Sequence, residues 1–321
     1  MLQRYLILWL SVSSLLAYFW PRWAGVSFDP FIASKPGISW LIVAIMFSIG
    51  MLLPREEIKQ VYRRWPMVLG GTTLQYLTMP FTAFVVASAF GFQGDQFVGI
   101  ILVGCVPGAM ASNVLTLNAR GNTSYSVSLT VMATLLSPLA VPVALAATLS
   151  GGEQLRPDFA ETSVKLLRTV VVPVVCGHLL SRVIHSSWEA RSRAVATVVA
   201  NLTILWIIAV VVGLNRERLA QLQTPLLIAL LLINLVGYGV GYGGGFLLRL
   251  PERMRRALTI EIGMQNAGLG VLLATEFFPA ATAIAPAMYT FGCMLTGTLL
   301  ASFWSRRHPQ DGDASKKSKG G

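Results

Sequence analysis

Apolar stretches of close to twenty residues recur along the whole 321-residue chain, with few charged residues inside them. A helix needs about 20 apolar residues to cross a lipid bilayer, whereas a buried strand of a soluble protein spans roughly 4–8. Charged residues make up 12% of the chain, against about 25% in soluble proteins. Lipid offers no hydrogen bonds to the backbone, so spans must be helices or a closed barrel. Because strand-like alternation is absent, the sequence predicts an all-α polytopic membrane protein.

Ten apolar segments can be drawn, five in each half of the chain. They cover residues 3–20, 37–53, 66–90, 97–118, 123–149, 163–184, 195–214, 224–248, 256–276 and 281–303. Five spans per half allow an internal repeat, and the second copy would be inverted because an odd number of spans reverses the chain direction. Such a repeat would divide the chain into a first five-helix copy over 1–150 and a second, inverted copy over 160–304. The polar segment 305–321 is predicted to be a disordered, basic cytoplasmic tail.

The net charge of +11 has two interpretations, a nucleic-acid partner or basic cytoplasmic loops. Most Lys and Arg residues fall in every second connection, as the positive-inside rule requires when both termini are cytoplasmic. The positive net charge is therefore explained by cytoplasmic loops and does not indicate a nucleic-acid partner. Bulky Tyr18, Phe19 and Trp20 stand where a signal peptide would be cleaved, so the N-terminal segment is predicted to be a retained first span. The compact chain and short loops suggest a bacterial inner membrane.

Two of the ten segments are interrupted by glycine and polar residues. The fourth contains GCVPGAMASN (104–113), and the ninth, its counterpart in the second half, contains EIGMQNAG (261–268). Interrupted segments at matching positions of two halves indicate the binding site of a secondary transporter. The alternative is that the glycines serve close packing between helices.

Glu261 is the one acidic residue that lies well within an apolar segment. Placing a charge at the centre of a bilayer costs about 2.5–3.5 kcal/mol even on insertion scales. Such a carboxylate is protonated, paired with a cation, or bound to an ion. No Lys or Arg lies in the interior of another span, so the charge of Glu261 must be neutralised by a proton or by a metal cation. If the group is protonated, it could have a purely structural role, as a hydrogen bond between helices.

Neutral oxygen-bearing side chains accompany this carboxylate in the other apolar segments. Gln75 lies in the middle of the third, while Ser112 and Asn113 follow the interruption of the fourth. Ser126 and Thr130 share one helix face of the fifth, at a spacing of four residues. Together with Glu261, Gln265 and the carbonyls at the interruption of the ninth segment, these side chains offer the oxygen ligands by which hard cations are bound. One carboxylate suits a monovalent ion, which indicates Na⁺ with H⁺ as its competitor.

The motifs PGAMASNVLTLNARGN and SVSLT, with EIGMQNAGLG further on, resemble the bile acid:sodium symporter family, and the chain looks like a bacterial homologue. The resemblance covers nearly the whole chain. It implies ten transmembrane helices in two inverted five-helix repeats, with helices 4 and 9 broken and crossing. Spans 1, 2, 6 and 7 would form a panel domain, and spans 3–5 and 8–10 a core domain.

The resemblance also implies two coupling Na⁺ ions and their ligands. Site 1 would use Ser112, Asn113, Ser126, Thr130 and Glu261. Site 2 would use Gln75, Glu261 and Gln265 with the carbonyls of Ile262 and Met264. The substrate would lie near Met110, Ala111 and Asn266, where helix N-termini suit an anion. Some family members carry a small hydroxyl residue in place of Met110, so this chain is expected to take a more apolar ligand.

The sequence therefore predicts a sodium-coupled symporter of a small or amphipathic organic anion, such as a bile-acid-like, pantoate-like or other carboxylate. A proton-coupled transporter or exporter, and a non-transporting receptor on the same fold, remain alternatives. An intramembrane enzyme lacks support, because no His–Glu or His–Asp metal motif and no second intramembrane carboxylate is present. The three cysteines, Cys105, Cys176 and Cys293, all fall in apolar segments and have no metal-binding spacing.

Overall fold

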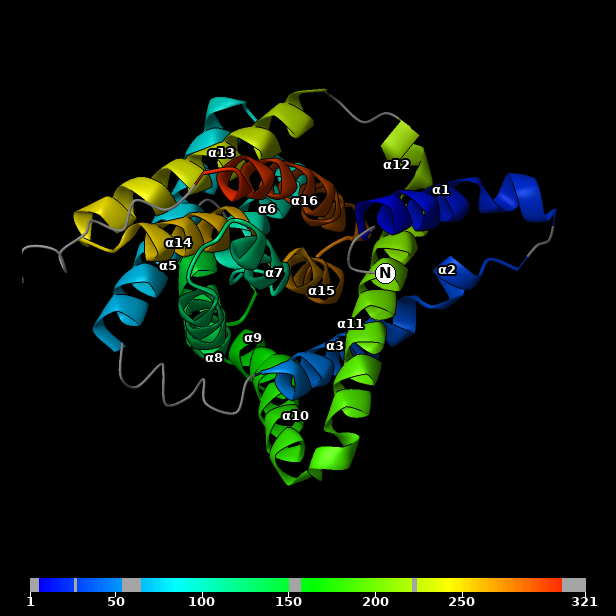
Figure 1. Ribbon diagram of the computed structural model, residues 1–321. Coiled ribbons are helices and arrows are strands. Elements are labelled where there is room, and N and C mark those ends of the chain that lie inside the picture. The colour runs from blue at the N-terminus through cyan, green and yellow to red at the C-terminus, as the bar shows by residue number, and fades with distance from the viewer. Residues whose placement is uncertain (1–5, 26–27, 54–64, 150–156, 221–223, 308–321) are drawn as a thin grey trace, which may run out of the picture.

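The computed structural model describes residues 6–25, 28–53, 65–149, 157–220 and 224–307, and its helices are shown in Figure 1. The first half contains α1 (Leu6–Ala24), α2 (Pro30–Ala33), η2 (Lys35–Gly37), α3 (Ile38–Leu52), α5 (Trp65–Ala89), α6 (Gly94–Cys105), α7 (Ala111–Asn118) and α8 (Thr123–Thr148). The second contains α9 (Phe159–Leu166), η4 (Leu167–Val171), α10 (Val172–Val183), α11 (Ser186–Leu214), α12 (Arg216–Ala220), α13 (Thr224–Leu247), α14 (Glu252–Gly263), α15 (Ala267–Phe277), η5 (Ala280–Ala283) and α16 (Ile284–Ser305). Of the predicted disordered tail, residues 308–321 lie outside the described residues.

The helices are long and apolar enough for a membrane protein. Six helical stretches meet the length and hydropathy expected of a span. They are Lys35–Leu52, Thr123–Thr148, Phe159–Val183, Ser187–Leu214, Thr224–Leu247 and Ala280–Ser305. Large apolar side chains such as Trp40, Phe81 and Leu247 are exposed on the outside of the bundle, where lipid would cover them. The prediction of a helical polytopic membrane protein is confirmed, whereas ten spans in inverted repeats stay a prediction.

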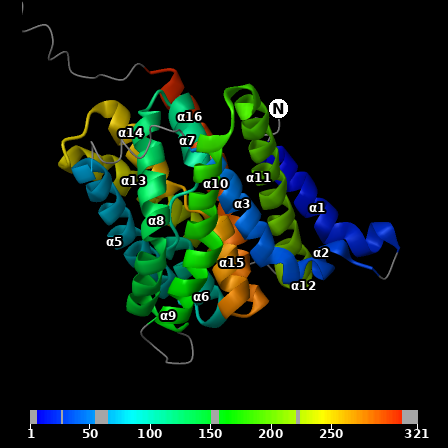
Figure 2. The ribbon, with the colours of Figure 1, turned by 90° about the horizontal axis from the view of Figure 1, so that it is seen from below.

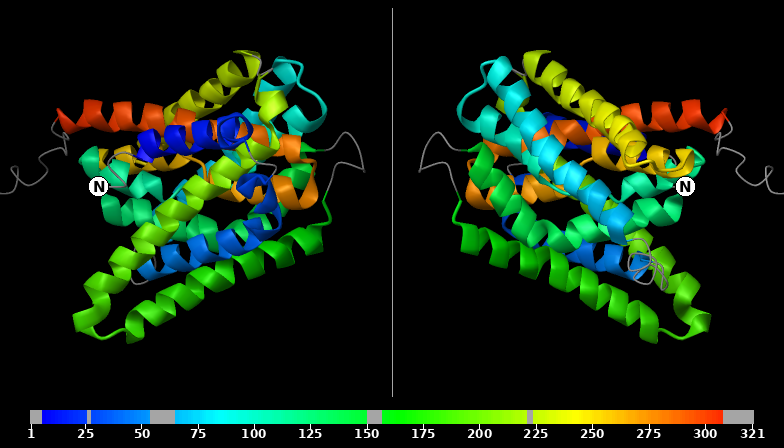
Figure 3. Two further views of the ribbon diagram at one scale, coloured as in Figure 1. Left: turned by 90° about the vertical axis from the view of Figure 1, so that its right-hand side faces the viewer. Right: turned by 90° about the vertical axis from the view of Figure 1, so that its left-hand side faces the viewer.

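Two groups of helices pack side by side. In the first, α3 packs on α10 and α11, and α1 packs on α11. Figure 3 shows α3 and α10 running together along one face of the molecule. Their backbones approach so closely that a Cβ at Gly50 or Gly177 would overlap a carbonyl oxygen of the facing helix. The second group contains α5, α6, α8, α13, α14 and α16, together with the short helices α7 and α15.

The helices stand roughly upright in Figure 2, with the two ends of the described chain at one end of the bundle. The turn between α10 and α11 lies at this same end, and α9, α12 and the end of α15 lie at the opposite one. We call the end that carries the chain ends the terminal end, and the other the distal end.

Asp29 and Arg216 form an ion pair at the distal end, outside the apolar helices. The Arg216 Nη1 to Asp29 Oδ2 distance is 2.5 Å, and both side chains are at most 16% exposed. Asp29 also accepts backbone hydrogen bonds from Phe31 and Ile32 at the start of α2. Burial alone would raise the pKa of Asp29, but the hydrogen bonds and the positive charge of Arg216 outweigh it and lower that pKa.

We expect Asp29→Asn to destabilise the folded protein by about 1–3 kcal/mol at pH 7, because the amide can still cap α2 but cannot pair with Arg216. The lowered pKa means that the carboxylate stabilises the fold above its unfolded pKa and loses this effect as the pH falls through the folded value. The melting temperatures of wild type and Asp29→Asn should therefore converge as the pH drops below about 4. A constant difference down to pH 3 would contradict this role of the charge.

Candidate functional site

Glu261 lies in the last turn of α14, and its side chain is fully buried. Its carboxylate accepts hydrogen bonds from three hydroxyls: Ser112 on α7 at 2.5 Å, Thr130 on α8 at 2.7 Å, and Ser126 on α8 at 3.5 Å. Among the residues that the structure describes, no Lys, Arg or His nitrogen lies within 4.0 Å of it. The structure thus brings together the predicted carboxylate and hydroxyls from three helices.

Asn113 is the neighbour of Ser112 on α7 and is also buried. Its Nδ2 atom approaches the sulfur of Met110 at 3.6 Å. Its Oδ1 atom is buried without a hydrogen-bond partner in the described structure. A buried oxygen that accepts no hydrogen bond costs free energy unless a donor or a cation fills the position. Asn113 therefore offers an unused buried oxygen on the residue that follows Ser112.

Part of the predicted second group of ligands is also brought together, although Glu261 has no hydrogen bond to Gln75 or Gln265 in the described structure. Gln75 on α5 donates through Nε2 to Oε1 of Gln265 at 3.2 Å, and both amides are buried. Gln265 in turn donates to the carbonyl of Ile262 at 2.9 Å. The Met264 carbonyl accepts the backbone N–H of Ala109 at 2.7 Å. The two predicted carbonyl ligands are therefore hydrogen-bonded here, although each carbonyl oxygen has a second lone pair.

Both predicted interruptions are present, and they meet. The chain leaves helical geometry between α6 and α7 and again between α14 and α15, and Gly108 forms an isolated antiparallel bridge with Gln265. Besides the Ala109 bond, the N–H of Asn266 donates to the carbonyl of Pro107 at 2.7 Å. A Cβ atom at Gly108 would overlap the Glu261 carboxylate. The absence of a side chain at Gly108 thus lets the two interrupted segments cross directly beside Glu261.

Two residues that were not predicted from the sequence, Asn234 and Tyr289, support the second interruption. The Gly263 carbonyl, left without a helical partner by the end of α14, accepts hydrogen bonds from Asn234 on α13 at 2.7 Å and from Tyr289 on α16 at 2.8 Å. Both side chains are buried. The sequence signal was available, since Asn234 is the single amide in α13. A lone amide in an apolar helix indicates a buried polar partner.

The residues predicted to contact substrate lie at the starts of two short helices. Met110 and Ala111 begin α7, and Asn266 precedes α15; all three side chains are partly exposed. The Asn266 Oδ1 atom accepts the N–H of Leu269 at 3.2 Å and so caps α15. The Asn266 side-chain nitrogen donates no hydrogen bond within the part of the chain that the structure describes.

A bundle of apolar helices in which two interrupted segments meet beside a buried carboxylate has the features of a secondary transporter as a class. The chain belongs to the sodium bile acid symporter family, since residues 39–222 match that family.

Similar proteins with assigned names are also sodium-dependent transporters or cotransporters. An uncharacterized sodium-dependent transporter of Bacillus subtilis, YocS, is 32% identical over 97% of this chain and 94% of its own length. A probable chloroplastic sodium/metabolite cotransporter of Arabidopsis thaliana, BASS1, is 29% identical over 85% of this chain and 68% of its own length. The ileal sodium/bile acid cotransporter of Oryctolagus cuniculus is 31% identical over 71% of this chain and 66% of its own length.

Proposed function

We propose that the protein is a secondary active symporter that moves an organic anion together with Na⁺. The observation that carries the proposal is a fully buried carboxylate, Glu261, surrounded by neutral oxygens and without a basic partner in the described structure. A cation bound there would neutralise the charge whose burial is otherwise costly. The names of the relatives, which specify sodium, favour Na⁺ over H⁺.

The proposed sites follow the two groups of ligands. Site 1 comprises Ser112, Asn113, Ser126, Thr130 and Glu261. The hydroxyl oxygens would coordinate the ion through their lone pairs, and the unpaired Asn113 oxygen would bind it as well. Site 2 comprises Gln75, Glu261 and Gln265 with the carbonyls of Ile262 and Met264. Two ions shared around one carboxylate would link α5, α7, α8 and α14, and so would stabilise the crossing.

The proposed substrate is a small or amphipathic carboxylate that binds beside the crossing. The starts of α7 and α15 carry backbone N–H groups and a partial positive charge, which suit a carboxylate. Met110 and Ala111 would contact its apolar part, and the Asn266 amide would donate a hydrogen bond. Because bound Na⁺ stabilises the helices that form this pocket, sodium and substrate would each strengthen the binding of the other.

The proposed architecture has ten spans in two inverted repeats, 1–150 and 160–304. The interrupted pairs α6–α7 and α14–α15 each count as one span. The first group, α1, α3, α10 and α11, corresponds to the panel, with α9 added because it belongs to the same span as α10. The second group corresponds to the core. The terminal end would face the cytoplasm, and the match to a Bacillus protein over almost the whole chain supports a bacterial cell membrane.

Transport would require the core to move against the panel, and three polar contacts join them at the distal end. Glu276 of α15 pairs with Lys165 of α9 at 2.8 Å and accepts a hydrogen bond from Ser39 of α3. Asn215 donates to the carbonyl of Ala280 at 3.2 Å. These contacts bridge the two groups, so they must break when the distal end opens.

We expect Glu276→Gln to favour opening of the distal end. The pair is about 30% exposed, so its loss should shift the equilibrium by a factor of about 1.4–5, equivalent to 0.2–1 kcal/mol. The measurement is the maleimide labelling rate of Asn215→Cys in a background without the native cysteines. Glu161→Gln, an exposed carboxylate at the start of α9, is the matched control. Equal labelling rates in the two variants would show that the pair does not hold the distal end closed.

The function is tested by a thermal-shift screen of purified protein against organic carboxylates, in NaCl and in KCl of equal ionic strength. The proposal predicts a carboxylate that raises the melting temperature only in NaCl, because a ligand stabilises the state it binds. A proton-coupled transporter would respond to pH and ignore the exchange of Na⁺ for K⁺. Ligand uptake into proteoliposomes, driven by a sodium gradient, then separates a symporter from a non-transporting receptor.

A further inference from the structure

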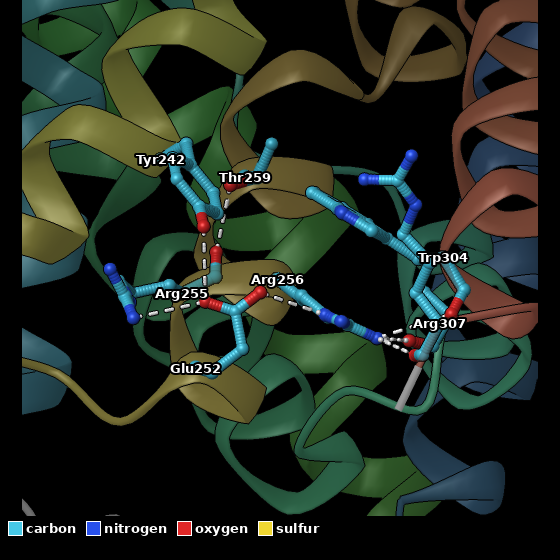
Figure 4. Close-up of polar contacts among 8 residues, drawn as sticks. Tyr242, Glu252, Arg255, Arg256, Thr259, Trp304 and Arg307 are labelled. Atoms are coloured by element: carbon cyan, nitrogen blue, oxygen red, sulfur yellow. Dashed lines mark hydrogen bonds and ion pairs between the residues drawn. The ribbon is translucent and has the colours of Figure 1, made fainter. Parts of the chain in front are cut away.

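A second buried cluster of charged residues lies in the first turns of α14, at the opposite end of this helix from Glu261 (Figure 4). The Arg256 side chain is 4% exposed and that of Glu252 9%, and Arg256 Nε donates to Glu252 Oε1 at 3.0 Å. Glu252 Oε2 pairs with Arg255 at 3.0 Å and accepts the Tyr242 hydroxyl at 3.1 Å. Each Glu252 oxygen therefore has partners, and Arg256 keeps its terminal nitrogens for other helices.

Arg256 uses one of these nitrogens, Nη1, to bind the ends of two other helices. Its Nη1 donates to the carbonyl of Ala119, which follows α7, at 2.9 Å. The same atom lies 3.2 Å from the carbonyls of Trp304 and Arg307 at the end of α16, and the guanidinium stacks 5.5 Å from the Trp304 ring centre. Helix C-terminal carbonyls lack intrahelical donors and carry partial negative charge. A buried cation therefore satisfies both ends at once.

The contacts show that α7 and α14 lie antiparallel and are joined at both of their ends. At the crossing, Ser112 donates to Glu261, and at the other end Arg256 binds the Ala119 carbonyl. The N–H of Asn122 also donates to the Arg253 carbonyl at 2.8 Å. The helix α16 is held in the same way, by Tyr289 on Gly263 at the crossing and by Arg256 at its end. Two of the helices that carry proposed site 1 ligands, α7 and α14, are thus joined through Arg256 at the end opposite the crossing.

We infer that Arg256 is a positioning residue that sets the sodium affinity of site 1 by fixing α7, with Ser112 and Asn113, against the Glu261 end of α14. This inference rests on the proposed function. Lysine would keep the charge at position 256, but its single nitrogen cannot hold Glu252 and both helix ends in the fixed geometry of a guanidinium. The affinity of the site is therefore expected to depend on the guanidinium and not on the charge alone.

The test measures the NaCl concentration that gives half-maximal thermal stabilisation of the purified full chain, with KCl added to constant ionic strength. Arg256→Gln should raise it about tenfold, within the range typical of coupling between separate sites, and Arg256→Lys should raise it by a smaller factor. The matched control is Arg255→Gln, because Arg255 pairs with the same Glu252 but has no hydrogen bond to α7 or α16 in the described structure. The control should change the value less than twofold.

Two further results separate this inference from its alternatives. If Arg256 only supports folding, Arg256→Lys will lower the melting temperature in KCl and leave the half-maximal NaCl concentration unchanged, which overturns the inference even if Arg256→Gln fails to fold. If wild type shows no response to sodium, the proposed function itself fails. In a double-mutant cycle, Ser112→Ala combined with Arg256→Lys should raise the half-maximal NaCl concentration by less than the product of the separate effects, because Arg256 acts through the helix that carries Ser112. Independent effects would contradict the inference.

Discussion

Replacement of Glu261 with glutamine will abolish the stabilisation of the protein by sodium and its sodium-driven uptake. Glutamine fills the same space and still accepts hydroxyl hydrogen bonds, but it removes the negative charge that balances the cation. At a sodium concentration of 100 times its dissociation constant, wild type gains about 2.7 kcal/mol that the variant lacks. The measurement is the melting temperature in a NaCl titration at constant ionic strength.

Stability without sodium separates this result from misfolding. Glu261→Gln removes a buried charge that costs about 2.5–3.5 kcal/mol on insertion scales, so in KCl the variant should be at least as stable as wild type. Glu161→Gln, an exposed carboxylate at the start of α9, should keep the full sodium response. A Glu261→Gln protein with wild-type sodium dependence would remove both proposed ion sites.

The second large effect is expected from Gly108→Ala at the crossing. A Cβ atom there would overlap Oε1 of Glu261, so either the carboxylate moves away from its hydroxyl partners or the two interrupted segments separate. Overpacking of this kind costs about 1–3 kcal/mol, and we expect the half-maximal NaCl concentration to rise about tenfold or more. The measurement is again the NaCl titration of thermal stability.

The control for this variant is Gly292→Ala on α16, where a Cβ would meet no atom within 4 Å. It adds the same methyl group to a helix of the same bundle and should leave the sodium response unchanged. If Gly108→Ala binds sodium within twofold of wild type, Glu261 does not hold the position from which the ion sites are derived.

Hydropathy predicted most of the helices, because the bilayer requires long apolar runs whatever the tertiary packing. It placed their ends less well. The segment predicted at 195–214 is part of a helix that begins at Ser186, nine residues earlier, since a helix can continue past the apolar region as a polar extension. The π-helical turn Leu167–Val171 within the sixth segment also has no counterpart in the apolar pattern.

The site could be predicted where its residues are polar exceptions in an apolar context. Glu261, Gln75 and Gln265 stand out for that reason. The structure pairs Glu261 with Ser112 and Gln75 with Gln265, while their role as ion ligands stays a prediction. The role of Arg256 could not be predicted, because an arginine at a segment boundary fits the positive-inside rule equally well. Only the packing of α7 and α16 against α14 shows that its guanidinium is buried.

Equilibrium binding of radioactive sodium to the purified protein most directly tests whether one membrane-buried acid retains its charge by holding an alkali ion. Saturable binding is expected, displaced by unlabelled Na⁺ but not by K⁺, and absent from Glu261→Gln. Undetectable binding to wild type, or equal binding to both proteins, would contradict the account.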